Sequence, residues 1–486
     1  MAAINFVGGS YTPVSASLDS QRTVNFYVEM DETKQGKAPA ALIRTPGLKL
    51  FCTLAGQFGV RAGGMYTTHT DVKDRAFLAY GNTLWEVNEF GTLFARGTLQ
   101  TSVGPVSMAD NGRFLVLVDG IYGYAYDLQT GLFQQITDPD FPGADKVTVL
   151  DNYLIFNRPR TQQFFWTNLS GVDFNALDFT SVDGFPDRLV SLLAYRRELW
   201  LFGATTTERW YNAGDLFFPF QRIQGGFSEQ GMAAPQSPAV IGDKLCWLTA
   251  NQEGAGMVYV VLAGQVQRVS THATEHAWQG YPQISDALGW AEQRDGHEFY
   301  WLTFPSGNAT WVFDLTSGLW HERAYLNPVT GTFDRHRANA ATYAFGLHLV
   351  GDWQNGNVYL LDMQTYSDNG APIRAVRRAP YLFAGKSPAN LPWVLHHTLQ
   401  IDCEMGVGLA SGPGSDPTLI LRWSDDGGAT WTLERTATLG RIGERRARAR
   451  FLRLGRSRSR IYEASISDPV IRTILGGYVE SEVTSV

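Results

Sequence analysis

The sequence predicts an all-β protein whose main part is a β-propeller. Short apolar or alternating runs, interrupted by glycine, asparagine and aspartate, extend along the whole chain, and 50 of the 486 residues are glycine. Such runs are typical of short strands joined by tight turns. A strand, a glycine-containing turn and a second strand rich in aromatic residues return about every 40–50 residues. This is the spacing of propeller blades.

Seven copies of this strand pair can be counted, which predicts a six- or seven-bladed propeller, six if the first and last copies share a blade. The copies begin at Phe77, Phe114, Tyr153, Leu199, Leu245, Phe299 and Leu347. Three copies end in a turn whose aspartate can accept backbone hydrogen bonds, namely Asp127, Asp314 and Asp362. A ring buries blade faces that a single blade leaves open. An array of β-sandwiches is the structural alternative.

The repeats divide the chain into three regions. Residues 56–366 form the predicted propeller, and Asn369–Pro372 marks a break after it. Residues 367–486 are again strand-like and predict a C-terminal β domain. Residues 1–55 contain strand patterns without the repeat, so we expect them to pack with the C-terminal domain and to stay outside the ring. Together the two terminal segments would form a β-rich platform.

The charge of the chain is low and unevenly distributed. Charged residues make up 18% of the sequence, against roughly 25% in typical soluble domains. This deficit indicates surface buried against partners or, equally, outer strand faces rich in Thr, Asn and Gln. Residues 441–460 hold nine Arg and one Glu, a local charge of +8; since the whole chain carries −7, the remainder carries −15. A general nucleic-acid binder, basic over a whole face, is therefore not indicated.

The cysteines and the termini favour folding in a reducing compartment. Cys52, Cys246 and Cys403 lie far apart and form no CxxC pair, so we expect no disulfide framework. The N-terminus has no basic stretch followed by an apolar core, and no run of 18 apolar residues exists. We therefore expect neither a signal peptide nor contact with a membrane.

Ser424, Asp426, Gly428 and Trp431 match the S-x-D-x-G-x-x-W pattern of the Asp-box. In such a turn Asp426 can cap backbone N–H groups, Gly428 supplies an open φ, and Trp431 folds back as an apolar anchor. We interpret these four residues as a structural turn. Sialidases carry several Asp-boxes in a six-bladed propeller, whereas this chain has one full match outside the repeats. A carbohydrate-active or carbohydrate-binding propeller is thus the alternative function, with no catalytic residues assignable.

Other candidate sites are weaker, and we predict no enzyme activity, cofactor or metal. His272 and His276 are spaced i, i+4 but do not form the H-E-x-x-H pattern of zinc proteases. Asp138 and Asp140 lie in a Pro/Gly loop that could bind calcium but is more typical of a plain turn.

The arginine run predicts a strand with one basic face. Arg446, Arg448 and Arg450 alternate with small or apolar residues, Gly455 breaks the alternation, and it then resumes. Guanidinium groups pair with carboxylates and phosphates. Two roles are open, contact with DNA and salt bridges between subunits through the acidic remainder of the chain, and we expect the inter-subunit interface. The predicted interface residues are Arg446, Arg448, Arg450, Arg456, Arg458 and Arg460.

Motifs at both ends of the chain resemble those of one family, the packaged-DNA stabilisation proteins of short-tailed bacteriophages. Near the N-terminus the similar stretches are Gln21–Tyr27 and Thr45–Leu48; at the C-terminus they are Leu421–Trp431, Arg453–Arg460 and Ser467–Pro469. These motifs cover about one-fifth of the chain and occur in the order found in the family. The middle is similar in kind only, as a propeller.

The resemblance implies a structural protein of the virion tail that resides in the host cytoplasm before assembly. Such a protein forms a hexameric hub, or nozzle, under the head-to-tail connector. It retains packaged DNA, contacts tailspikes or fibres and a tail needle or plug, and conducts double-stranded DNA without sequence specificity. No catalytic residue or cofactor comes with the resemblance. A generic cytosolic scaffold propeller is a further alternative.

Overall fold

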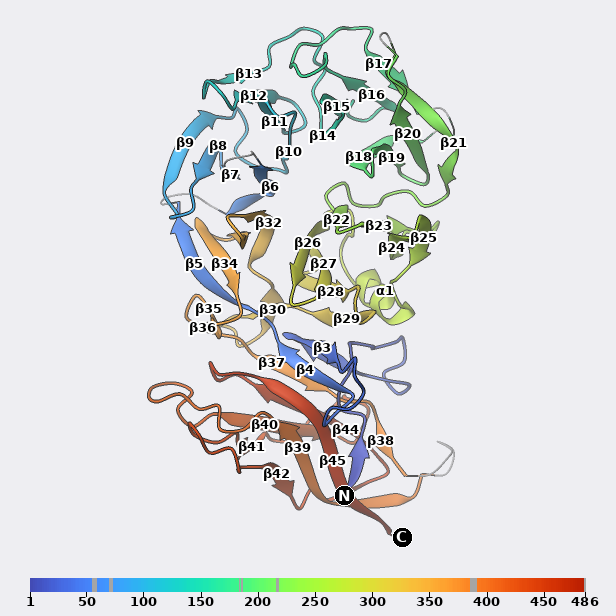
Figure 1. The fold of residues 1–486 in the computed structure, drawn as a ribbon. Coiled ribbons are helices and arrows are strands. Elements are labelled where there is room, and N and C mark those ends of the chain that lie inside the picture. Colours follow the sequence, from blue (N-terminus) through green and yellow to red (C-terminus); the bar gives the residue numbers. More distant parts are fainter. Residues whose placement is uncertain are drawn as a thin grey trace.

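The computed structural model describes residues 1–486 except 55–58, 70–72, 183, 185–186, 216–217, 385–390 and 485–486. A large ring of β-sheets stands on a smaller β domain, the platform, which carries both chain termini (Figure 1). The described residues contain 45 strands and one short helix, α1 (His272–Gln279). Among them no helix has the length and apolar character that a membrane span requires.

Six blades of the ring each consist of four consecutive antiparallel strands. The first three blades are β6 (Val60–His69), β7 (Asp74–Tyr80), β8 (Thr83–Val87) and β9 (Leu93–Thr98); β10 (Ser107–Asp110), β11 (Phe114–Val118), β12 (Gly123–Asp127) and β13 (Phe133–Gln135); and β14 (Val147–Leu150), β15 (Tyr153–Asn157), β16 (Gln163–Trp166) and β17 (Phe179–Ser181). The next three are β18 (Leu189–Tyr195), β19 (Glu198–Gly203), β20 (Thr207–Asn212) and β21 (Phe220–Ser228); β22 (Ala239–Ile241), β23 (Lys244–Ala250), β24 (Gly256–Leu262) and β25 (Gln265–Arg268); and β26 (Leu288–Arg294), β27 (His297–Phe304), β28 (Ala309–Asp314) and β29 (Leu319–Glu322).

A seventh blade completes the ring with a strand from the N-terminal segment. It comprises β32 (Ala338–Ala344), β33 (Leu347–Asp352), β34 (Asn357–Asp362) and β5 (Gly47–Thr53). The propeller prediction is confirmed, and each of the seven copies counted in the sequence lies in the second strand of one blade. The expectation that residues 1–55 stay outside the ring is wrong for β5. Without β5, the edge of β34 would remain unpaired, because the repeats supply only three strands there.

The predicted turns after the third strands are held as the aspartate pattern indicates. In the second blade, Asp127 Oδ1 accepts hydrogen bonds from the backbone N–H groups of Gln129, at 2.8 Å, and Thr130, at 3.0 Å. Asp314 Oδ1 accepts one from the Thr316 N–H at 3.0 Å in the sixth blade. The core of each blade lies against the next blade, as where residues of β7 and β11 pack in one cluster.

The platform is a sandwich of two sheets made from both ends of the chain, as predicted. One sheet contains β3 (Phe26–Met30), β4 (Ala40–Arg44), β45 (Thr473–Thr484), β39 (Trp393–Cys403), β42 (Ala449–Leu452), β1 (Ala2–Ile4) and β43 (Arg456–Ser457). The other contains β2 (Arg22–Val24), β37 (Ala375–Arg378), β44 (Ser459–Ile466), β40 (Thr418–Ser424), β41 (Arg435–Thr438) and β38 (Leu382–Phe383). Apolar residues of both sheets, including Leu399, Leu421 and Phe451, form its core.

The propeller and the platform share one continuous sheet. Strand β2 pairs with β29 of the sixth blade on one side and with β37 on the other. The Arg22–Glu322 ion pair, at 2.7 Å, spans the same junction. The remaining strands near it are the hairpin β30 (Ala324–Leu326) and β31 (Phe333–Arg335) and the short pair β35 (Ser367–Asp368) and β36 (Ala371–Pro372). The two parts are therefore joined by backbone pairing as well as by side chains.

A buried histidine also joins the two parts. His297 of the sixth blade, 4% exposed, has Asp314 Oδ2 at 2.8 Å from Nδ1 and Glu29 Oε2, from the platform strand β3, at 2.8 Å from Nε2. The Asp314 hydrogen bond raises the His297 pKa to about 9 and outweighs burial, which lowers it. The ordinary pKa of histidine is about 6.5. The stability that protonated His297 contributes to the fold is therefore fully present below about pH 6.5 and is lost as the pH rises through about 9.

We predict that Glu29→Gln lowers the free energy of unfolding at pH 7 by about 1 kcal/mol, because a half-exposed hydrogen bond to a charged group is lost. The decline of stability between pH 7 and 9 should also become shallower. Denaturant titrations at several pH values measure both effects. Glu32→Gln is the matched control, since Glu32 is exposed and makes no ion pair within the described part of the chain. An unchanged pH profile in Glu29→Gln would contradict the role of this contact.

Candidate functional site

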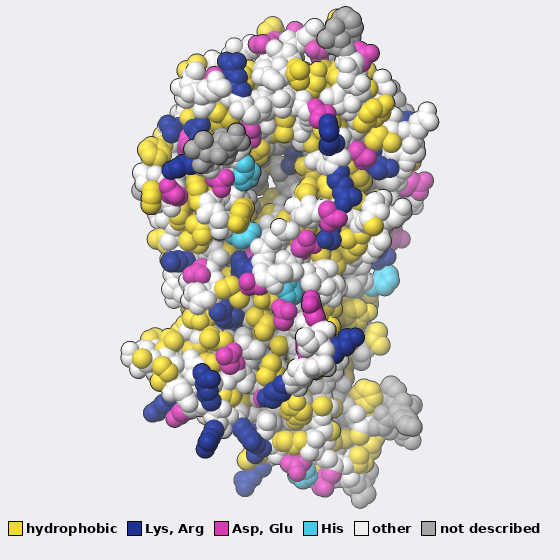
Figure 2. Space-filling model, in the orientation of Figure 1, with side chains coloured by type: hydrophobic (Ala, Val, Ile, Leu, Met, Phe, Trp, Pro, Cys, Tyr) yellow, Lys and Arg dark blue, Asp and Glu magenta, His cyan; other side chains and the backbone are white. Residues whose placement is uncertain are grey.

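The candidate site is the arginine-rich edge of the platform, formed by residues 441–460. Figure 2 shows Lys and Arg side chains gathered over the lower part of the molecule, which is the platform. The predicted strand is shorter than expected: β42 begins at Ala449. Around it the alternation holds, because Arg448 and Arg450 are exposed whereas Ala449 and Phe451 are buried.

Arg446, Arg448 and Arg450 line a hollow of about 980 Å³ on this edge, which we call the basic hollow. Arg450 Nε donates a hydrogen bond to Gln400 Oε1 at 2.8 Å, while for Arg446 and Arg448 the described residues provide no ion pair. The other charged residues of the lining are Lys37, Asp402, Glu404 and Arg445. Lys37 is paired with Asp402 at 2.5 Å. Five cations against two carboxylates leave the hollow with a charge of +3.

Residues 453–460 of the arginine-rich edge differ from the prediction. Arg453 and Gly455 have positive φ values of 56° and 77°, so the chain turns there and the alternation restarts. Arg456 and Arg458 are exposed and lie over the ring of Trp393, with 4.9 and 5.1 Å from guanidinium carbon to ring centroid.

The expectation that Arg460 belongs to the exposed interface strip is wrong. Its side chain is 1% exposed, and Nε donates to Asp425 Oδ1 at 2.6 Å while Nη2 donates to Oδ2 at 2.8 Å. Nη1 donates to the Leu454 carbonyl at 2.7 Å. The exposed Arg456 precedes, and the exposed Arg458 occupies, a bend between β43 and β44, and Arg460 lies after that bend on β44, where its side chain points into the platform. Arg460 is thus a structural residue.

The Asp-box turn is held by its own side chains. Asp426 Oδ1 accepts hydrogen bonds from Ser424 Oγ at 2.7 Å and from the Thr430 N–H at 2.9 Å. The Gly428 N–H donates to Ser424 Oγ at 2.8 Å, and Gly428 has a φ of 92°. The Thr430 hydroxyl contributes most to lowering the Asp426 pKa to about 2. The turn is therefore stable above the ordinary aspartate pKa and weakens only as the pH falls towards 2.

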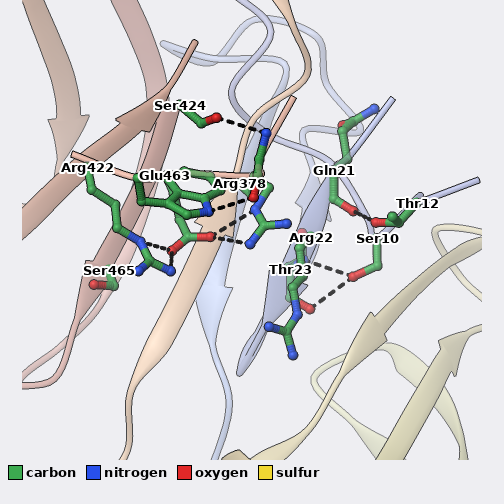
Figure 3. A network of polar contacts seen from close by, with 12 residues as sticks. Ser10, Thr12, Gln21, Arg22, Thr23, Arg378, Arg422, Ser424, Glu463 and Ser465 are labelled. Carbon is green, nitrogen blue, oxygen red and sulfur yellow. Dashed lines mark hydrogen bonds and ion pairs between the residues drawn. The ribbon is translucent and has the colours of Figure 1, made fainter. Parts of the chain in front are cut away.

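Trp431 does not anchor the turn in an apolar core, contrary to expectation. The side chain is half-buried, and the guanidinium carbons of Arg378 and Arg422 lie 4.7 and 4.8 Å from the centroid of its ring. Both arginines pair with Glu463, which is 3% exposed: Arg378 Nε donates to Oε2 at 2.9 Å and Arg422 Nε to Oε1 at 2.6 Å. Figure 3 shows the two arginines converging on this carboxylate.

We predict that Trp431→Ala lowers the free energy of unfolding by roughly 1–2 kcal/mol, the worth of partly desolvated cation–π contacts. A fully buried aromatic would cost about 3–5 kcal/mol. Denaturant unfolding of the variant measures the loss. A stability equal to that of the unaltered chain would show that the ring contributes nothing to the arginine pair.

No sequence pattern singles out Arg378, Arg422 and Glu463. Glu463 on β44 lies opposite Arg422 on β40 and Arg378 on β37. Opposite charges at directly paired positions are a signal of strand pairing, but it is visible only once the strands have been paired. The three strands are far apart in the chain, and one sequence does not align them.

The weaker candidates do not form a metal site within the described ranges, where no cluster of three or more His, Cys, Asp or Glu residues has metal-binding geometry. Asp138 Oδ2 and Asp140 Oδ2 accept hydrogen bonds from the backbone N–H groups of Phe174, at 3.3 Å, and Ala176, at 3.1 Å. They hold two loops together. His272 and His276 lie on α1, and the three cysteines are buried free thiols.

Comparison with known proteins gives a family for both parts of the chain. A family model described as "Bacteriophage P22 Gp10, beta-propeller" matches residues 2–366, and one described as "Bacteriophage P22 Gp10, beta-sandwich" matches residues 387–482. No curated protein matches the chain.

Solved structures resemble the chain at low identity. The extracellular domain of the two component system BT4673 from B. thetaiotaomicron has a TM-score of 0.44 and 9% identity, over 72% of this chain and 43% of that one. The N-terminal domain of Nup159 has a TM-score of 0.41 and 9% identity, and the match covers 71% of this chain and 99% of that one. The WD40 domain of Neurospora crassa Pan2 has a TM-score of 0.41 and 7% identity, and the match covers 65% of this chain and 96% of that one. The chain thus matches less than half the length of the BT4673 domain.

Proposed function

The chain belongs to the bacteriophage P22 Gp10 family of phage stabilisation proteins, and from this premise we propose that it is the hub of a short phage tail. Members of this family are phage tail components. In our proposal six copies close a ring below the portal and its connector. This ring retains the packaged DNA and forms part of the conduit through which the DNA is ejected.

The observation that carries the proposal is the basic hollow on an otherwise acidic molecule. Arg446 and Arg448 are exposed and unpaired within the described residues, whereas the chain outside residues 441–460 carries −15. A basic patch and an acidic body on one chain are complementary between neighbouring copies. A head-to-tail contact of this kind closes into a ring if its rotation permits.

The arginines serve the interface better than they would serve DNA. Arg446, Arg448 and Arg450 share their hollow with Asp402 and Glu404, so it is not the uniformly basic face that is typical of a nucleic-acid binder. Affinity through phosphate contacts would also slow DNA release, because each contact displaces counterions. The acidic partner is a neighbouring copy or the connector.

The remaining partners in this proposal are tailspikes or fibres on the flanks of the ring, a tail needle or plug at its end, and double-stranded DNA in the lumen. The role is structural and non-enzymatic, and it requires no cofactor. Before assembly the protein resides in the host cytoplasm.

The proposed function is tested by complementation. Filled heads that carry the connector but lack this protein should leak DNA, and addition of the purified chain should stop the leak and restore infectivity. Nuclease-protected DNA measured over time gives the result. Heads that retain their DNA equally well without the chain would refute a role in DNA retention.

A further inference from the structure

A small hollow of about 200 Å³ lies on the axis of the propeller, and Figure 2 shows the ring hollowed around that axis. Residues of the first, second, third, fifth, sixth and seventh blades line it, among them Gly63, Ser107, Lys146, Gln236, Trp290 and Asn339. We call it the axial hollow. Since one water molecule takes about 30 Å³, the axial hollow has room for a small ion with a few waters but not for a chain of nucleic acid.

Lys146 gives the axial hollow its charge. The residue is 9% exposed, and no other charged residue is found among the described residues of the lining. Its Nζ donates a hydrogen bond to Gln236 Oε1 at 2.6 Å. Because Lys146 belongs to the third blade and Gln236 to the fifth, this contact crosses the axis. An ammonium group has three donors, so two of them remain for a further partner.

The charge of Lys146 is not neutralised inside the axial hollow. The preceding residue, Asp145, lines a neighbouring hollow of about 920 Å³ instead, and it forms no ion pair with Lys146 in the described part of the chain. Burial lowers the Lys146 pKa to about 7, although the charge of Asp145 acts in the opposite direction. A buried charge without a partner is costly, so an anion beside Nζ would stabilise the ammonium form.

Other donors of the lining also lack acceptors. The Lys146 contact uses Gln236 Oε1, and the Nε2 group of Gln236 has no partner within the described ranges. Trp290 is 8% exposed, and its Nε1 is buried without an acceptor among the same residues. By contrast, three side-chain oxygens of the lining already take part in hydrogen bonds, those of Tyr66, Ser107 and Asn339. Unused donors that outnumber unused acceptors are what an anion requires.

A glycine in the lining makes this arrangement possible. Gly63 has a φ of 69°, a conformation that favours glycine. A Cβ at this position would lie 2.3 Å from the Val106 carbonyl oxygen and 3.1 Å from Gln236 Oε1. A larger residue would therefore crowd the amide that reaches across the axis to Lys146.

We propose that the axial hollow binds one small inorganic oxyanion, of the phosphate or sulfate type, through Lys146 Nζ and Gln236 Nε2. An oxyanion offers several acceptor oxygens at once, and its hydrogen bonds to an ammonium group are strengthened by charge. The bound ion links the third and fifth blades across the axis. The site is complete within one copy, so it is independent of the proposed assembly into a ring of six.

Equilibrium dialysis of the purified full chain against radioactive sulfate, in excess sodium chloride, tests the proposal. It measures how many ions bind and how tightly, and we expect one saturable site per copy. Because the basic hollow also attracts anions, the measurement is repeated with a chain in which Arg446, Arg448 and Arg450 are replaced by glutamine. The saturable site should persist in that chain.

Two substitutions locate the ion. Lys146→Met keeps a long unbranched side chain but removes the charge, and it should weaken sulfate binding at least tenfold. Gln236→Glu keeps the size of the side chain and places a carboxylate beside Lys146. It should also weaken binding at least tenfold, while the unfolding midpoint in sulfate-free buffer rises. Lys49→Met is the matched control, with binding within twofold of the unaltered chain, since Lys49 is exposed on β5 and lines neither hollow.

Thermal unfolding gives an independent readout. Sulfate stabilises folded proteins in general, but it should raise the unfolding midpoint of the unaltered chain and of Lys49→Met more than that of Lys146→Met. Absence of saturable binding would show that the axial hollow holds water only. Binding that Lys146→Met and Gln236→Glu leave unchanged would show an adventitious ion only. Either result would overturn the proposal.

Discussion

Replacing Arg446, Arg448 and Arg450 together by glutamine is expected to leave the protein folded and to prevent its incorporation into phage tails. The monomer should tolerate the change because the three side chains are exposed and, among the described residues, only the Arg450 side chain makes a hydrogen bond, to Gln400. At an interface, each partner carboxylate that loses its mate costs about 2–5 kcal/mol. Centrifugation of assembled particles followed by detection of the protein measures incorporation.

The control carries the same change of charge elsewhere. Arg158, Arg160 and Arg197 are exposed on the third and fourth blades, and their replacement by glutamine should permit assembly. Complete tails in the first variant, with only retention or the salt dependence of ejection changed, would assign the arginines to DNA instead.

Glu463→Gln is expected to cause the largest loss of stability, about 3–5 kcal/mol, because it removes the charge that pairs two arginines in the platform. Glu463 is 3% exposed, and the variant leaves Arg378 and Arg422, which both contact the Trp431 ring, without the carboxylate that they share. Urea unfolding of the full chain, monitored with a probe that reports on the platform, measures the loss of stability.

Glu434→Gln is the matched control, since Glu434 pairs with Arg374 at 3.0 Å but its side chain is 47% exposed. Exposed pairs are worth about 0–1 kcal/mol. Equal losses of the free energy of unfolding in Glu463→Gln and Glu434→Gln would show that the buried Glu463 stabilises the platform no more than an exposed ion pair does.

The repeated blades were predictable because their signals are local. Each second strand, such as Phe114–Val118 or Lys244–Ala250, carries its apolar run and its turn within one stretch of chain. The closure of the ring was not predictable, since β5 pairs with β34 across about 300 residues. Nothing in the pattern of Gly47–Thr53 distinguishes a strand of the ring from one of the platform.

The arginine-rich edge was likewise predictable only where its signal is local. Alternation correctly indicated exposed Arg448 and Arg450 beside buried Ala449 and Phe451. It failed at Arg460, because the chain bends at Arg458 between β43 and β44 and the alternation does not continue across that bend. The contacts of Trp431 depend on arginines brought together from separate strands, β37 and β40, and such contacts require the three-dimensional fold.

Imaging of the tail of the mature virion at side-chain resolution tests the central claim most directly. We predict a ring of six copies under the connector, with Arg446, Arg448 and Arg450 against carboxylates of a neighbouring copy or of the connector. Any other symmetry at this position, or three arginines directed into the DNA lumen without a protein partner, would contradict the account.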